Sequence, residues 1–443
     1  MAAKFKCILK RVAIGFALLL AGLLVFNGVL AWRAQQRLKM KILELRAAGE
    51  PTTLQELAPK HIPADENAAA QLAPIADDLT AWETQFLHEF LVTKLGESWF
   101  NSNSQGLLPS EAQLAVIEPI LDAYPKILLA VDRAATAEQY GSLLNYDVSW
   151  GQFMAETVED LQSKRLLANY VDAKMRALAA QGKRDEAVRF GIKLLQIARH
   201  YDQDPLLLNY FVSITIRGIT IGSLNGVLQS GPVGPEARNE LDAELAKQDA
   251  AKPLIRALKT ERAASQEVVQ SIFPSISKFL FWPLENCQAE LIDFYNQTIL
   301  AAGHPWIESH DAVERIQAKA NSEATYAKVL VPKLKNVFMV ENRNIVELRC
   351  LRVLNSLNGF LQANSREPAN IQELGLPDTA VIDPFSGKPL KLRKVDKGWL
   401  VYSVYENEID DGGELKGMKD WGLAPPGYED DDSNGKNSEP QAD

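Results

Sequence analysis

An apolar segment near the N-terminus constrains this chain more than any other feature of its sequence. The run from Val12 to Trp32 contains one polar side chain, Asn27. A helix of that length spans about 30 Å, enough to cross the hydrocarbon layer of a bilayer. Lysine and arginine residues precede the run, and Trp32 stands where an interfacial aromatic residue is expected. The sequence therefore predicts a transmembrane helix over 12–32, preceded by a cytoplasmic leader over 1–11.

Three other interpretations of this segment compete with a retained anchor. A buried helix of a soluble domain rarely runs so long without polar interruptions. A cleaved signal peptide is a stronger alternative, because Val29-Leu30-Ala31 loosely fits a cleavage site, but the run exceeds the usual length of about 7 to 15 residues. We therefore favour a signal-anchor. A pilin helix is rejected, since Gly15-Phe16 resembles a prepilin junction but Leu20 stands where pilins carry a glutamate.

Charge gives little guidance on orientation, because basic residues lie on both sides of the apolar run. Five of them follow it, namely Arg33, Arg37, Lys39, Lys41 and Arg46. Long C-terminal domains are translocated largely regardless of nearby charge. We therefore expect a single-pass protein of the inner (cytoplasmic) membrane, with the bulk of the chain extracytoplasmic.

The overall charge excludes one class of partner. The net charge is −10 and the sequence pI is near 5.3, whereas nucleic-acid binding needs a concentrated positive surface. Part of the acidity lies in the last residues, where Glu429 to Asp443 carry six carboxylates and one lysine. Such a segment buries too little apolar surface to offset its ordering entropy, so we expect a disordered tail over 426–443.

Three cysteines, Cys7, Cys287 and Cys350, show no metal-binding spacing and no CxxC motif. An exported body would place Cys287 and Cys350 in an oxidising compartment, where they could form a disulfide. The alternative is two buried, unbridged thiols.

The central part of the chain is predicted to be helical. A juxtamembrane helix and a linker over 33–66, with a short helical turn near Leu54–Leu57, lead into an all-α hairpin domain over 67–354. Its clearest hairpin starts at Asp160 and turns at 181–184. The sequence Gln181-Gly182-Lys183-Arg184-Asp185-Glu186-Ala187-Val188 resembles the turn and second helix of a tetratricopeptide unit, although no clean second copy follows at a period of about 34 residues.

The C-terminal part, 355–425, has a different pattern. A long helix over about 344–363 precedes the sequence Asp383-Pro384-Phe385-Ser386-Gly387-Lys388-Pro389-Leu390, and two β-prone runs flank a turn at 396–398. With the later Asp410-Asp411-Gly412-Gly413, this layout resembles the C-terminal part of type II secretion pseudopilins. It also resembles uncharacterised single-pass membrane proteins of planctomycete type. The fold class expected is mainly α, with a transmembrane helix, a hairpin domain and a small α+β module.

The pseudopilin resemblance implies a metal site. In that family a loop that follows a strand containing Tyr-Ser binds calcium, and the matching pair here is Tyr402-Ser403. By position, Glu406, Asn407, Asp410 and Asp411 would supply the oxygen ligands. Calcium takes six to eight oxygens, so these four would form part of a shell. This chain departs from the family pattern at Tyr405 and Glu408, where small residues or glycine are usual. The alternative is a solvated acidic turn.

Catalytic motifs are scarce. The five histidines show no HExxH spacing, His304 and His310 are expected at the surface, and no nucleophile elbow, P-loop or dinucleotide fingerprint occurs. Carboxylate pairs such as Asp77-Asp78 and Glu159-Asp160 are expected on solvated helix faces. We expect a non-enzymatic, membrane-anchored binding or scaffolding protein of the cell envelope with an envelope protein partner. The alternatives are an accessory component of a type II secretion or pilus-like system, and an envelope hydrolase; the oligomeric state stays open.

Overall fold

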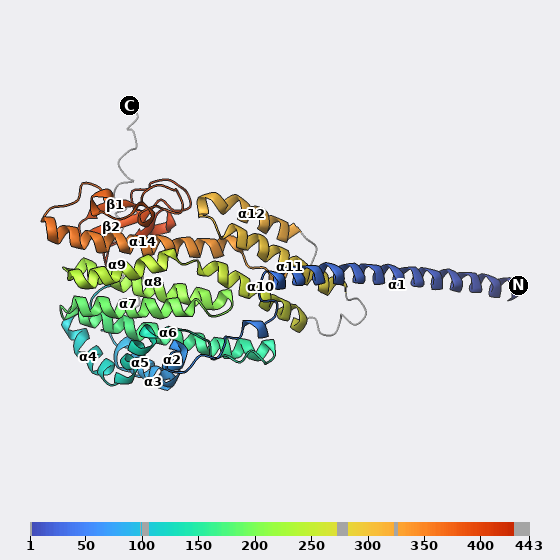
Figure 1. The fold of residues 1–443 in the computed structure, drawn as a ribbon, viewed down its shortest axis with the longest axis horizontal. Coiled ribbons are helices and arrows are strands. Elements are labelled where there is room, and N and C mark those ends of the chain that lie inside the picture. The colour runs from blue at the N-terminus through green and yellow to red at the C-terminus, as the bar shows by residue number, and fades with distance from the viewer. Residues whose placement is uncertain (1, 98, 100–105, 273–281, 323–326, 429–443) are drawn as a thin grey trace, which may run out of the picture.

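A single long helix and a helical body make up the protein. The structure is a computed structural model that describes residues 2–97, 99, 106–272, 282–322 and 327–428. Helix α1 (Ala2–Ala47) contains 46 residues and is about 69 Å long at about 1.5 Å per residue. Its first half projects away from the body, and its second half lies against it (Figure 1). The helix predicted over 12–32 therefore continues without a break through the basic segment that follows.

The body is mainly helical, as the sequence predicts. Its α-helices are α2 (Ala68–Leu72), α3 (Ala76–Phe86), α4 (Glu111–Asp122), α5 (Pro125–Thr136), α6 (Trp150–Ala180), α7 (Arg184–Tyr201), α8 (Leu207–Ser230), α9 (Pro235–Ala250), α10 (Pro253–Ile272), α11 (Trp282–Ala301), α12 (Trp306–Ser322), α13 (Ala327–Leu330) and α14 (Leu334–Asn364). Short 3-10 helices cover Gln55–Leu57, Ala73–Ile75, Ile371–Leu374, Asp378–Ala380 and Lys416–Met418, and Leu87–Leu91 forms a π-helical turn.

Helices α6 and α7 form the predicted antiparallel hairpin. The turn between them contains Gly182 at φ +80°, a conformation that glycine adopts without steric cost. Proline starts α9 and α10 at Pro235 and Pro253, where the missing N–H is harmless in the first helical turn. The sequence signals for helix starts are confirmed at these points.

The second half of α1 is docked on α11. Arg37 donates to Asp293 at 2.8 Å and to Asn286 at 3.0 Å, and Lys41 forms an ion pair with the same Asp293. Ala34 and Leu45, which lie on either side of these polar contacts along α1, are buried, each 7% exposed. The docked half of α1 is therefore held by apolar packing as well as by charge.

Two helices are long and apolar enough to cross a membrane, and their environments differ. None of the apolar window within Ala13–Ala47 is buried, whereas two thirds of the window in α8 is buried inside the body. Helix α8 is therefore a core helix. The exposed window lies near the N-terminus and is the candidate anchor, although a signal sequence has the same composition.

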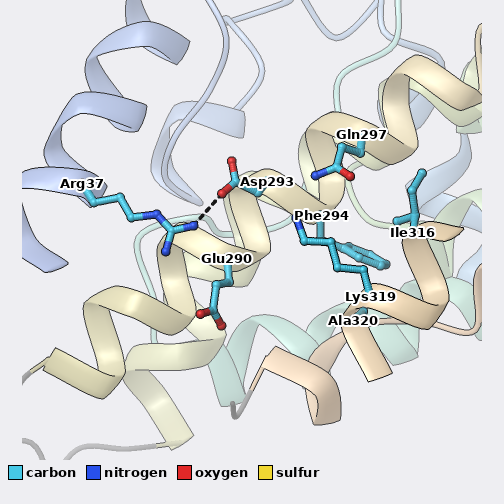
Figure 2. Close-up of a pocket in the computed structure, with 8 residues that line it drawn as sticks. All are labelled: Arg37, Glu290, Asp293, Phe294, Gln297, Ile316, Lys319 and Ala320. Atoms are coloured by element: carbon cyan, nitrogen blue, oxygen red, sulfur yellow. Dashed lines mark hydrogen bonds and ion pairs between the residues drawn. The ribbon is translucent and has the colours of Figure 1, made fainter. Parts of the chain in front are cut away.

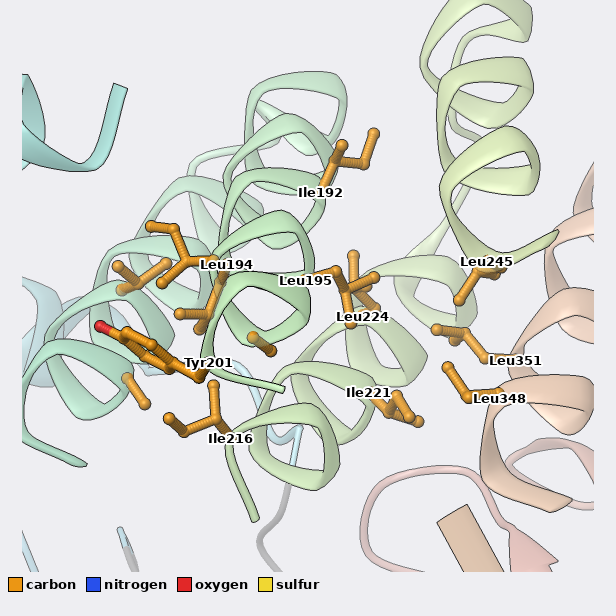
Figure 3. Close-up of a cluster of buried hydrophobic side chains, with 14 of the residues drawn as sticks. Ile192, Leu194, Leu195, Tyr201, Ile216, Ile221, Leu224, Leu245, Leu348 and Leu351 are labelled. Carbon is orange, nitrogen blue, oxygen red and sulfur yellow. The ribbon is translucent and has the colours of Figure 1, made fainter. Parts of the chain in front are cut away.

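The core of the body lies where α7, α8 and α14 meet. Leu195 of α7, Leu224 of α8 and Leu351 of α14 have no exposed surface, and Figure 3 shows them converging between the helices. Leu245 of α9 packs on the same cluster. Full burial of each such side chain stabilises the fold by about 1.5–3 kcal/mol.

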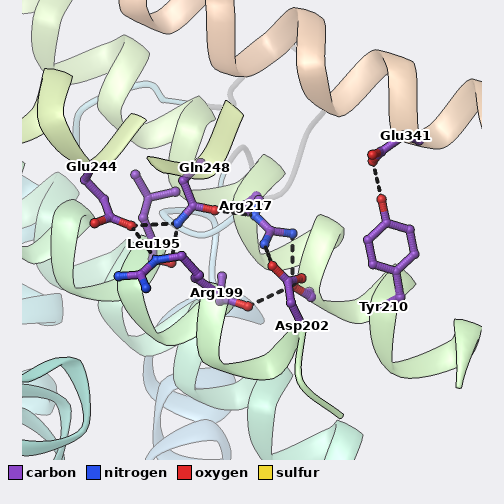
Figure 4. A network of polar contacts seen from close by, with 10 residues as sticks. Leu195, Arg199, Asp202, Tyr210, Arg217, Glu244, Gln248 and Glu341 are labelled. Carbon is purple, nitrogen blue, oxygen red and sulfur yellow. Dashed lines mark hydrogen bonds and ion pairs between the residues drawn. The ribbon is translucent and has the colours of Figure 1, made fainter. Parts of the chain in front are cut away.

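A buried polar network crosses the same helices (Figure 4). Arg217 of α8 pairs with Asp202, and it donates to Gln248 of α9 at 2.8 Å and to Ser213 at 3.0 Å. Gln248 in turn donates to the carbonyl oxygen of Leu195 at 2.8 Å. Each of these polar groups is satisfied inside the protein, so the network fixes how α7, α8 and α9 pack.

The C-terminal part contains a small antiparallel sheet in the order β1 (Lys391–Val395), β2 (Gly398–Ser403) and β3 (Trp421–Leu423). Val395 pairs with Gly398 across the predicted turn, and Val401 pairs with Leu423. Helix α14 packs against β2 and β3. The boundary expected between residues 354 and 355 lies inside α14, which therefore belongs to both parts, and α14 begins ten residues before the predicted start at 344.

Cys287 of α11 and Cys350 of α14 are both buried and free. The unbridged alternative therefore describes this structure. The tail predicted to be disordered begins within the described chain, where Tyr428 accepts a hydrogen bond from Arg393 at 3.1 Å, and residues 429–443 lie outside the described residues.

Candidate functional site

A cleft of about 340 Å³ opens between α2, α3 and α6. One wall is apolar and comes from α2, α3 and the 3-10 turn between them, where Leu72, Ile75 and Leu79 line the space. The opposite wall is one face of α6, whose carboxylates Glu156, Glu159 and Asp160 line it. The volume lies within the range of about 300 to 1,000 Å³ that is typical of ligand pockets.

The loop between α5 and α6 lines part of the cleft and is anchored to the start of α2. Asn67 caps α2 by accepting a hydrogen bond from the backbone of Ala69 at 3.1 Å. Its side chain also donates to the carbonyl oxygen of Gly141 at 2.9 Å and accepts from the Gly141 N–H at 3.0 Å. A Cβ on Gly141 would lie 2.9 Å from Ile62, so glycine allows this close approach. Leu143 and Leu144 follow and line the cleft.

Lys164 lies at the polar end of the cleft between two carboxylates. Its ammonium group is 2.5 Å from Asp160, one turn earlier on α6, and forms a second ion pair with Asp204, which precedes α8. The Tyr140 hydroxyl donates to the same Asp204 at 2.6 Å, and the Lys164 ammonium lies 4.8 Å from the centre of the Tyr201 ring. Two helices and two loops, distant in sequence, therefore meet at one buried lysine.

Burial and charge shift the pKa values of this group. Burial alone would lower the pKa of Lys164, but Asp204 and Asp160 outweigh that effect and raise it above the usual value. Burial, together with the charge of Asp204, raises the pKa of Asp160 and holds that of Tyr140 well above 10. Lys164 therefore keeps its positive charge at neutral pH, and Tyr140 stays a neutral donor.

Two buried atoms near this end of the cleft have no hydrogen-bond partner among the described residues. They are Asp204 Oδ1 and His200 Nδ1. The His200 ring stacks on Tyr140 with centroids 6.1 Å apart, and burial lowers its pKa to about 4. His200 is therefore neutral at physiological pH.

The outer part of the acidic wall is less tightly engaged. Glu156 accepts hydrogen bonds from two neutral donors, the Asn145 N–H and the Gln152 amide, both at 3.2 Å. Glu159 is exposed. The expectation that Glu159-Asp160 forms a solvated pair thus holds for Glu159. It is wrong for Asp160, which is half-buried because its position on α6 faces Lys164 and the cleft.

The predicted calcium ligands lie in the loop after β2, and each has a partner within the protein. Glu406 pairs with Lys335 of α14, and Asp410 lies 3.1 Å from Lys391 of β1. Asn407 donates to Asp411 at 2.7 Å, so these two side chains are adjacent. Asp410 also accepts from the Tyr402 hydroxyl at 3.0 Å.

The two departures from the family pattern occupy unusual backbone conformations. Tyr405 has φ +53° and Glu408 has φ +58°, the left-handed region in which glycine or asparagine is commoner. Within the described residues, no three or more histidine, cysteine, aspartate or glutamate side chains gather in a geometry that could hold a metal ion. Calcium binding by Glu406, Asn407, Asp410 and Asp411 therefore stays a prediction.

A much smaller cavity, of about 30 Å³, lies where α1 meets α11 and α12. Figure 2 shows Arg37 of α1 pointing to Asp293 of α11, with Phe294 and Lys319 on the side away from α1. A cavity of this size admits water. This cavity lies at the joint between α1 and the body, and it is too small for an organic ligand.

The remaining sequence candidates lie at the surface. His304 is exposed, as expected, and lies 3.4 Å from Glu308, whereas His310 is partly buried and lies 3.2 Å from Asp311. The sequence reasoning missed Lys164 and Asp204. The one local signal was the spacing of Asp160 and Lys164, which are four residues apart and therefore adjacent on a helix.

Comparison with known proteins provides no family for the chain. No family model, no curated protein and no solved structure matches it.

Proposed function

We propose that this protein is a non-enzymatic binding or scaffolding protein of the cell envelope, anchored in the inner membrane by α1. The observation that carries the proposal is the continuity of α1. One half is apolar and exposed, and the other half is docked on α11 through Arg37 and Lys41. A helix built in this way fixes the body at the membrane surface and sets its orientation.

The position of Trp32 relative to α11 supports this arrangement. Gln35 donates to Glu285 at 3.4 Å. Trp32 lies one helical turn before Gln35, and Trp282 lies one turn before Glu285. The start of α11 is therefore at the height of Trp32, the expected interfacial residue. The body would rest against the headgroups, with the stacked hairpins and the cleft turned toward the extracytoplasmic space.

Stacked helical hairpins suit a binding role, because they present extended surfaces to partner proteins. The α6–α7 hairpin and its tetratricopeptide-like turn fit this role, and the partner expected is another envelope protein. The proposal requires a retained anchor. Full-length protein should stay in the membrane pellet after alkaline carbonate extraction, and its intact mass should include residues 1–32. Soluble protein that begins after residue 31 would contradict the proposal.

A matched control separates anchoring from incidental adhesion. When residues 1–32 are replaced by a cleavable signal peptide, the body should be released into the soluble envelope fraction. If this control also stays in the pellet, the body binds the membrane by itself and the anchor is not required.

A second candidate function is that of an accessory component of a type II secretion or pilus-like system. It is favoured by the packing of the long helix α14 against a three-stranded antiparallel sheet, followed by the acidic loop at 406–413. Deletion of the gene should then abolish export of secreted enzymes while leaving the envelope otherwise intact. Normal secretion in the deletion strain would exclude this role.

An envelope hydrolase is the third candidate, and the cleft is the reason to keep it. Asp160 faces the cleft and has a raised pKa, a property common among catalytic acids. A hydrolase of this kind should lose turnover in Asp160→Asn and retain it in Asp132→Asn, which changes an aspartate outside the cleft. Equal turnover in the two variants would remove this candidate.

A further inference from the structure

The cleft between α2, α3 and α6 has two walls of opposite chemistry. Leu72, Ile75 and Leu79 make one wall apolar, and Leu143, at the cleft's edge, is 60% exposed. An apolar side chain exposed at the edge of a cleft offers surface that a ligand can cover. The other wall is acidic along successive turns of α6.

The charges of the cleft do not balance. Among the residues that line it, Lys164 is the one cation, and its single charge is shared by Asp160 and Asp204. Glu156 and Glu159 add two further carboxylates, and the two donors bonded to Glu156 are neutral. Three carboxylates and one ammonium group therefore line the cleft, and it carries a net negative potential that attracts a cation.

The position of the cleft argues against a lipid as its occupant. Helices α2 and α3 lie on the part of the body away from the end at which α1 projects (Figure 1). If α1 spans the bilayer, lipid headgroups lie beside the first turn of α11 and away from the cleft. Within the described residues no metal-holding cluster occurs either, so the acidic wall does not gather around an ion.

We propose that this cleft binds a segment of a partner protein that presents a basic side chain next to apolar side chains. The ammonium or guanidinium group would pair with Glu156 and Glu159, and the neighbouring apolar side chains would pack on Leu72 and Leu143. The inference rests on the proposed function, since it names the partner chemistry that a binding protein with this cleft recognises. Buried Lys164 limits how deeply the basic side chain of the partner can enter the cleft, because its ammonium group repels a second cation from Asp160.

The test uses full-length protein in nanodiscs of zwitterionic lipid and a short fluorescent peptide of alternating lysine and leucine. Fluorescence anisotropy should show saturable binding. The double variant Glu156→Gln/Glu159→Gln keeps the shape of the wall and removes its charge, so it should weaken binding at least roughly tenfold. The matched control Glu186→Gln/Glu314→Gln removes the same charge from exposed positions elsewhere and should leave the dissociation constant unchanged.

Three further measurements separate the contributions of charge, shape and apolar contact. Ser163→Trp would fill the cleft without changing its charge, and it should also abolish binding of the peptide. A peptide of alternating glutamate and leucine should not bind, and one of alternating lysine and alanine should bind more weakly than the leucine peptide. Binding that is equal for all three peptides, or unaffected by Glu156→Gln/Glu159→Gln, would overturn the assignment.

Other outcomes distinguish this inference from the proposed function. Binding of decylamine in place of the peptide would assign the cleft to a small amine and overturn the peptide proposal. If an envelope partner crosslinks equally well to the wild type and to Glu156→Gln/Glu159→Gln, the protein binds through another surface. In that case the proposed function stands and the assignment of the cleft fails.

Discussion

Arg217 is one of the largest side chains that the body buries completely, and it is charged. Removing one partner of a buried ion pair leaves the other charge unpaired, at a cost of about 3–5 kcal/mol. We expect Arg217→Met to lower the free energy of unfolding by about this amount, because Asp202 would then lie buried without its counter-ion. Urea unfolding of the full-length protein in detergent micelles measures the change.

A control for this change lies on the neighbouring helix. Arg189 is exposed and bridges Glu236 at 3.0 Å and Glu240 at 3.3 Å on α9. Exposed ion pairs contribute about 0–1 kcal/mol, so Arg189→Met should have little effect. Similar losses in the two variants would contradict the structural role assigned to Arg217.

Glu347 of α14 predicts a pH effect with a defined sign. Burial raises the pKa of Glu347 from 4.5 to about 7. The hydrogen bond that the Trp421 indole N–H of β3 donates to Glu347 at 3.2 Å opposes this shift. Between pH 4.5 and 7 the native state therefore binds a proton that the unfolded state has lost. The free energy of unfolding should fall as pH rises through this window, by roughly 1 kcal/mol per pH unit from this group.

Glu347→Gln removes this contribution, since glutamine does not titrate. Relative to the wild type, the variant should gain stability as pH rises from 4.5 to 7, as measured by urea unfolding at several pH values. The exposed control Glu314→Gln should follow the wild-type profile. A constant difference between Glu347→Gln and the wild type at every pH would show that Glu347 does not titrate in this window.

At the scale of elements, the contact between α1 and α11 determines how the body is held. Leu45, in the docked half of α1, is 7% exposed, while Leu43 on the same helix is 49% exposed. Leu45→Asp would bury an unpaired charge and should loosen the docked half of α1. We expect faster amide hydrogen exchange over residues 34–47 in this variant, measured by mass spectrometry. Leu43→Asp should leave exchange unchanged, and equal exchange in the two variants would contradict the docked arrangement.

The loop after β2 gives a second prediction at this scale. If Asp410 and Asp411 hold calcium, the ion should raise the melting temperature of the wild type. The variant Asp410→Ala/Asp411→Ala should lose that response. The variant also loses the contact between Asp410 and Lys391, so the response to added calcium is the informative quantity. Asp378→Ala, at an exposed position of the same module, serves as the control. An unchanged calcium response in the double variant would end the calcium prediction.

Local sequence signals predicted the elements they control directly. The turn at 181–184, the start of α9 at Pro235 and the short helix at Gln55–Leu57 follow from glycine, proline and capping preferences of adjacent residues. Strand β3 was not predicted, because three residues are too few to show alternation. It also contains Gly422, where a Cβ would collide with the backbone of β2.

The candidate site was largely invisible in the sequence for a different reason. Lys164 and Asp204 are 40 residues apart, and Tyr140 is 64 residues from Asp204. Tertiary packing brings these residues together, and no periodic pattern in the sequence predicts their proximity. The apolar run of α1 is contiguous, so the sequence predicts it directly. The docking of α1 on α11 was not predicted, because it depends on Asp293 and Asn286, which are distant in the sequence.

At the scale of the whole molecule, the central claim is that α1 spans the inner membrane and holds the body outside the cytoplasm. Two cysteines test it in intact cells with a permeable outer membrane. Native Cys7 lies in the leader, and Ala155→Cys places a thiol at an exposed position of α6, while Cys287 and Cys350 are buried. The account predicts that a membrane-impermeant maleimide labels Ala155→Cys in intact cells and labels Cys7 after lysis. Labelling of Cys7 in intact cells, with Ala155→Cys protected until lysis, would contradict it.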